Sequence, residues 1–198
     1  MKHKLARFIS LAFHPIIFAI IMPFFVVYKE TTNVLYGLEW TGFSLLFLIF
    51  ALIAFFLVRP KEFLSDFDIS KKEQRHIFYS ISALTAILYF ITALIFKGVF
   101  FPLSIVAIGI LLGIVIFDIC TYYMKISIHT AVIAAFVVTE GMAYGFMPFL
   151  IVVWILPLMV WSRVSMKKHT IYEAIAGIVV GSLITFLTFF IAKILYVE

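Results

Sequence analysis

Long apolar runs alternate with short polar connections along the whole of this chain. Seven apolar segments can be distinguished, and each is close to the length that an α-helix needs to cross a bilayer. They occupy approximately residues 8–28, 41–58, 77–96, 99–117, 127–144, 147–161 and 170–195. The pattern predicts an all-α fold, a polytopic transmembrane helix bundle with six to seven spanning helices. We expect residues 1–198 to form a single integral membrane domain.

The composition favours a membrane protein over a soluble one. Hydrophobic residues make up 65% of the 198 residues and charged residues 13%, too little polar side chain to cover a soluble domain of this size. One cysteine, Cys120, excludes an intrachain disulfide and a zinc site built from several cysteines.

The basic residues are distributed unevenly between the two sides that the pattern defines. With seven crossings, the N-terminus and the connections 59–76, 118–126 and 162–169 lie on one side. Of the 15 Lys and Arg residues, all but Lys29, Lys97 and Lys193 fall there. Because cytoplasmic loops are enriched in Lys and Arg, we expect a multi-pass protein of the cell (inner) membrane, with a cytoplasmic active face and an external C-terminus. The placement of this charge indicates topology and no nucleic-acid partner.

The connections on that side carry most of the polar residues that could take part in catalysis or ligand binding. His169 and Glu173 are four residues apart at the start of the last apolar segment, so a carboxylate can accept the imidazole N–H, fix its tautomer and raise the basicity of the other nitrogen. With Arg163 nearby to neutralise an oxyanion, such an imidazole can attack phosphorus. A second histidine, His129, could protonate the leaving oxygen. The pattern predicts a phosphoryl-transfer site at the membrane surface.

One motif resembles a signature motif of a known protein superfamily. Ser162-Arg163, five residues, His169, three residues and Glu173 resemble the third signature motif of the type-2 phosphatidic acid phosphatase and haloperoxidase superfamily, normally Ser-Arg-x5-His-x3-Asp. The resemblance is to the membrane lipid phosphatase branch of that superfamily.

Two further segments resemble the other motifs of the same superfamily. Residues 126–129, Ile-Ser-Ile-His, are similar to the second motif, normally Pro-Ser-Gly-His. The first motif, Lys-x6-Arg-Pro, has a degraded counterpart in Asp68, six residues, Arg75 and His76, so that an acid stands where the family has a phosphate-binding lysine. The resemblance implies a phosphatase-like core at about residues 59–195.

Residue by residue, the resemblance implies a mechanism. His169 would be the nucleophile that forms a phosphohistidine, Glu173 would orient it in place of the usual aspartate, and His129 would be the general acid. The phosphate-binding residues would be Arg163, Ser127 and Arg75. Lys125 and Asp68 are possible further residues of the site, although a carboxylate at Asp68 would repel a phosphate group. Such enzymes need no metal or other cofactor, and their partners are lipid phosphate or diphosphate substrates and membrane lipids.

Two other functions remain open from the sequence. An intramembrane prenyltransferase would hold magnesium between pairs of aspartates; Asp66 and Asp68 are candidates, but Asp118 has no acidic partner at helical spacing. A non-catalytic membrane protein that binds or transports lipid phosphates is favoured by the altered first motif.

Three residues of the apolar segments receive a structural interpretation. His14, within Phe-His-Pro, is expected to be a buried, hydrogen-bonded histidine and not a catalyst. Gly177 and Gly181 form a GxxxG pair on the stripe that also carries His169 and Glu173, which predicts close packing against a neighbouring helix.

Overall fold

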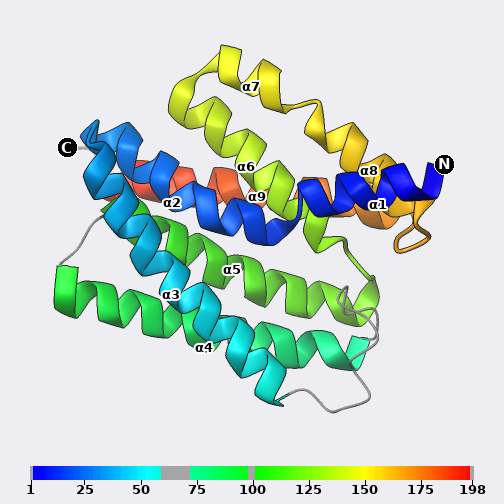
Figure 1. Ribbon diagram of the computed structural model, residues 1–198, viewed down its shortest axis with the longest axis horizontal. Coiled ribbons are helices and arrows are strands. Elements are labelled where there is room, and N and C mark those ends of the chain that lie inside the picture. Colours follow the sequence, from blue (N-terminus) through cyan, green and yellow to red (C-terminus); the bar gives the residue numbers. More distant parts are fainter. Residues whose placement is uncertain (1, 59–71, 98–100, 197–198) are drawn as a thin grey trace.

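In the computed structural model, residues 2–58, 72–97 and 101–196 are described, and their regular secondary structure is entirely α-helical (Figure 1). The helices of these ranges are α1 (Lys2–Ala12), α2 (Pro15–Thr31), α3 (Val34–Val58), α4 (Lys72–Lys97), α5 (Phe101–Tyr123), α6 (Ile128–Tyr144), α7 (Phe146–Val152), α8 (Ile155–Ser165) and α9 (Ile171–Tyr196). The sequence also predicts a turn at Lys97-Gly98 and a capping box from Ser70 to Glu73. Gly98 and Ser70, like Asp66 and Asp68, lie outside these ranges.

The helices have the lengths and composition of a multi-pass membrane protein. Six are long and apolar enough to cross a bilayer when α1 with α2, and α7 with α8, are each counted as one span, and the 17-residue α6 is a shorter apolar helix. Large apolar side chains such as Leu46, Leu57 and Ile194 point outward. The expectation of an all-α polytopic bundle with six to seven spanning helices is confirmed.

Two of the seven expected segments are not single helices. The first, 8–28, is divided between α1 and α2, because Pro15 disfavours a helical conformation at the residue before it and His14 is extended at φ −69° and ψ 140°. The sixth, 147–161, is divided between α7 and α8. The sequence also predicts a helix start at Pro148, where a missing N–H costs nothing, but Pro148 is the third residue of α7.

The boundary expected at residue 41 is also wrong. Helix α3 begins at Val34, because the Asn33 side chain accepts the backbone N–H of Tyr36 at 3.0 Å and so caps the helix earlier.

Helix α6 lies among α2, α7, α8 and α9 and packs most closely on α9. A Cβ added to Gly177 would lie 2.5 Å from the Ser127 carbonyl oxygen, and one added to Gly181 would lie 2.8 Å from the carbonyl carbon of Ala131. Because the two helices lie so close together, there is no space for larger side chains at these positions. The close packing predicted from the GxxxG pair is confirmed.

Several helix ends gather at one end of the bundle. Figure 1 shows the N-terminus, the start of α4, the end of α5, the start of α6, the end of α8 and the start of α9 at one end, with the C-terminus at the other. We call the first of these the site end. Residues from three separate connections therefore meet there, as the alternation of apolar segments predicts.

Candidate functional site

His169 lies between α8 and α9 at the site end and is buried, with 8% of its surface exposed. Its Nδ1 is 3.1 Å from the Lys125 carbonyl oxygen and 3.3 Å from Glu173 Oε2. A carbonyl and a carboxylate can only accept hydrogen bonds, so these neighbours assign the ring proton to Nδ1. In the neutral ring, Nε2 then carries the lone pair.

Glu173 belongs to a capping box that starts α9. Its Oε2 accepts the backbone N–H of Thr170 at 2.9 Å, while the Thr170 hydroxyl accepts the backbone N–H of Glu173 at 3.2 Å. The reciprocal pair satisfies two of the N–H groups that a helix N-terminus leaves without helical acceptors. The cap holds the carboxylate one turn from His169, so Glu173 contributes to helix geometry and to the site together. The Thr-x-x-Glu spacing was a signal for this cap in the sequence.

Three cationic side chains come together around His169 from separate connections. Arg75 of α4 donates from Nη1 to the Ile126 carbonyl at 3.1 Å, and Lys125 donates from Nζ to the Lys168 carbonyl at 3.3 Å. Arg163 of α8 donates from Nη1 to the Ser10 hydroxyl at 2.9 Å. Both guanidinium-bearing residues are buried, with exposed fractions of 2% for Arg75 and 1% for Arg163.

This environment determines the protonation of His169. Its pKa is lowered to about 4, mainly by burial and also by the positive charges of Arg163, Lys125 and Arg75, while the Glu173 carboxylate acts in the opposite direction. The sequence suggested only the effect of the carboxylate, which burial and the three cations outweigh. The imidazole is therefore neutral at pH 7.

Arg75 owes its position to the packing of α4 on α5. The neighbouring side chain of His76 pairs through Nδ1 with Oδ1 of Asp118 on α5, and its ring lies 4.9 Å from that of Tyr122. Asp118, a candidate magnesium ligand in the prenyltransferase interpretation, is thus engaged by a histidine. Asp68, the possible counterpart of the family lysine, lies outside the described residues.

Ser127 and His129 are at the start of α6. Ser127 is fully buried; its hydroxyl caps α6 by accepting the Thr130 N–H at 3.4 Å, and its own N–H donates to the Glu173 carbonyl at 3.2 Å. His129 is buried too, and its ring is 5.0 Å from that of His14 at an interplanar angle of 86°. The start of α6 is thereby tied directly to the start of α9.

The N-terminal helices bring residues to the site end that sequence reasoning did not assign to it. The Ser162 hydroxyl donates to the Ala6 carbonyl at 2.6 Å, and Ser10, the next residue on the same face of α1, accepts from Arg163. His14 follows at the same four-residue spacing. The spacing was visible in the sequence, but nothing in the hydropathy pattern indicated that α1 packs on α8.

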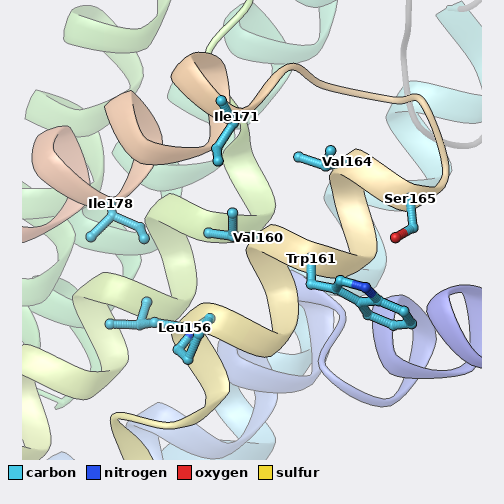
Figure 2. Close-up of a pocket in the computed structure, with 8 residues that line it drawn as sticks. Leu156, Val160, Trp161, Val164, Ser165, Ile171 and Ile178 are labelled. Carbon is cyan, nitrogen blue, oxygen red and sulfur yellow. The ribbon is translucent and has the colours of Figure 1, made fainter.

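An apolar groove with a volume of about 510 Å³ lies between α8 and α9. Figure 2 shows its labelled side chains on the two helices, with Ser165 near one end. They come from the helices that flank the His169 connection: Leu156, Pro157, Val160, Trp161, Val164 and Ser165 of α8, and Ile171 and Ile178 of α9.

The comparisons with known proteins identify no relative. No protein-family model, curated protein or solved structure matches this chain.

Proposed function

We propose that this chain is a membrane lipid phosphatase that removes phosphate from a lipid phosphate or diphosphate through a phosphohistidine on His169. The observation that carries the proposal is the setting of that imidazole. Its Nδ1 faces two acceptors, its pKa is lowered to about 4, and Arg75, Lys125 and Arg163 surround it with positive charge. A neutral imidazole among cations suits attack on an anionic phosphoryl group.

The reaction follows from these groups in two steps. Nε2 of His169 forms a bond to phosphorus as the bond to the leaving oxygen breaks, and protonated His129 gives its proton to that oxygen. Water then attacks the phosphorus of the phosphohistidine and gives a proton back to His129. The bond between phosphorus and Nε2 breaks, so that phosphate is released and neutral His169 is regenerated. The net reaction is lipid phosphate plus water to lipid alcohol plus phosphate.

A lipid substrate is supported by the surroundings of the site. The connection that carries His169 joins α8 and α9, and the apolar groove lies between these two helices. A hydrocarbon chain in the groove would leave its headgroup near the site end, where Lys167 and Lys168 follow α8. Together with the distribution of basic residues, this favours a substrate drawn from the cytoplasmic leaflet of the cell membrane.

A protein that binds lipid phosphate without turnover is the second candidate. It is favoured by the contacts of the two guanidinium groups, since Arg163 donates to Ser10 and Arg75 donates to the Ile126 carbonyl. Groups committed to such bonds hold the fold together and have less freedom to follow a phosphoryl group through its transition state.

The decisive experiment measures phosphate release from several lipid phosphates in detergent containing a chelator. We compare the wild type with His169→Asn, whose amide N–H can still donate to the Lys125 carbonyl, and with His3→Ala, an exposed position on α1. Loss of a nucleophile that acts with positioned partners lowers the rate by about a thousandfold or more. We expect that loss for His169→Asn and none for His3→Ala.

Each alternative gives a different result in the same assay. Lipid phosphate binding by the wild type with no release of phosphate would support the non-catalytic candidate. A reaction that stops in the chelator and returns with magnesium would favour prenyl transfer. Release by His169→Asn at the wild-type rate would remove His169 from the nucleophile role.

A further inference from the structure

The N-terminal helices, which lie outside the range that resembles the phosphatase core, touch the site end at three successive positions. On α1, the Ala6 carbonyl accepts from Ser162 and the Ser10 hydroxyl accepts from Arg163 at 2.9 Å. His14 then stands between α1 and α2, with its ring against His129. The same four-residue spacing brings a carbonyl, a hydroxyl and an imidazole to residues of the site.

The break between α1 and α2 determines how the His14 ring is held. Pro15 cannot donate a backbone hydrogen bond, and the extended conformation of His14 makes it the N-cap of α2. Its Nδ1 accepts the N–H of Ile16 at 3.3 Å. Because a nitrogen that accepts carries no proton, this cap assigns the proton of the neutral ring to Nε2. The cap thus fixes the orientation and the tautomer of His14.

The contact between the two rings restricts the orientation of His129. The two rings are nearly perpendicular, at 86°, with their centroids 5.0 Å apart, the edge-to-face arrangement that aromatic rings favour. His129 belongs to the first turn of α6, whose start is fixed by the Ser127 cap. One side of the His129 ring is therefore in contact with an imidazole that is itself hydrogen-bonded in the cap of α2.

We propose that His14 is a positioning residue that holds the His129 imidazole in the orientation needed to protonate the leaving oxygen. This inference rests on the proposed phosphatase function. General acid catalysis contributes most where the leaving group is a poor one, such as the alkoxide of a lipid alcohol, and least where the leaving group departs without a proton. The role of His14 should show the same dependence.

The test compares two substrates, a lipid monophosphate and p-nitrophenyl phosphate, whose leaving group departs without protonation. The central variant is His14→Asn, because asparagine can also cap α2 while it removes the ring from His129. We expect kcat for the lipid phosphate to fall about tenfold or more, with KM within a few-fold, and a much smaller loss of kcat for p-nitrophenyl phosphate. His3→Ala, also on the N-terminal segment, should behave as the wild type.

A second variant separates the ring contact from the cap. His14→Phe retains an aromatic ring next to His129 but removes the acceptor for Ile16, so it should recover part of the lipid phosphate rate while lowering the unfolding temperature. Equal losses with both substrates, or no loss with either, in a folded His14→Asn protein would overturn the positioning role. If the wild type releases no phosphate, or His169→Asn remains active, the proposed function itself fails and His14 loses its role with it.

Discussion

Gly177 offers a direct test of how the site is held together. Replacing it with alanine adds one methyl group where α9 crosses the start of α6. The new Cβ would lie 2.5 Å from the Ser127 carbonyl oxygen and would also overlap the Thr130 hydroxyl. Thr130 donates to the Ala174 carbonyl at 2.8 Å, and the Ser127 N–H donates to the Glu173 carbonyl at 3.2 Å. The methyl group therefore pushes apart the two helices that these bonds join.

The size of the displacement follows from the contact distance. Ordinary Cβ contacts begin at 3.4 Å, so the backbones must separate by about 0.9 Å to relieve a contact of 2.5 Å. Overpacking of this kind destabilises a fold by about 1–3 kcal/mol. A catalytic group misplaced by about 1 Å can lose about a hundredfold in rate. We expect Gly177→Ala to lower both the unfolding temperature and kcat, since His169 and Glu173 move with α9 while Ser127 and His129 move with α6.

The assay combines thermal unfolding in detergent with phosphate release. Gly42→Ala is the matched control, because a Cβ at this position in α3 would meet no atom within 4 Å. Gly113→Ala is a second control on α5, where the nearest atom would be Ile184 Cδ1 at 3.8 Å. If Gly177→Ala has the stability and kcat of these controls, the close crossing of α6 and α9 is not what positions the site.

Three other expectations follow from the same contacts. Lys125→Met removes one of the cations that lower the pKa of His169 to about 4. The acid limb of the pH–rate profile, where His169 becomes protonated, should therefore move from near pH 4 to higher pH, and an unchanged limb or one at lower pH would contradict this. Val160→Phe fills the groove between α8 and α9 and should raise KM several-fold for a long-chain lipid phosphate but not for a short-chain one. Leu158→Phe, at an exposed position that does not line the groove, should leave both KM values unchanged. Equal effects of Val160→Phe on both chain lengths would exclude the groove as the site of the hydrocarbon chain. In a Cys120→Ser background, an impermeant thiol reagent applied to intact cells should label a cysteine at position 29 and spare one at position 167, and the reverse pattern would invert the orientation.

Much of the fold could be predicted because helix length in a membrane is set by bilayer thickness. Apolar runs of about 20 residues identified the spans, and their alternation grouped the polar connections at one end. The errors came from local effects that hydropathy does not record. Asn33 caps α3 earlier than the first strongly apolar run suggests, and the residue before Pro15 leaves the helix. Both effects depend on single side chains, which the apolar average conceals.

In the candidate site too, features that depend on nearby residues could be predicted, whereas features that depend on tertiary packing could not. His169 and Glu173 could be paired from their spacing, because residues four apart share one face of a helix. Gly177 and Gly181 could be assigned to close packing for the same reason. The contacts of Ser10 with Arg163 and of His14 with His129 could not, because each joins residues more than 100 positions apart and depends on where α1 and α2 pack. The catalytic roles of the site residues stay predictions.

The balance of charge around His169 connects the structural and chemical interpretations of the site. Three of the charged groups that act on this imidazole are cations, Arg75, Lys125 and Arg163, and one is the Glu173 carboxylate. Hydrogen bonds to Ser10 and to backbone carbonyls satisfy donors of these cations but do not neutralise their charge. Charges held close together in a buried region repel one another strongly, because the effective dielectric constant is low. A phosphate dianion would offset this repulsion, so the arrangement that is costly for folding also favours the ligand that the proposed reaction requires.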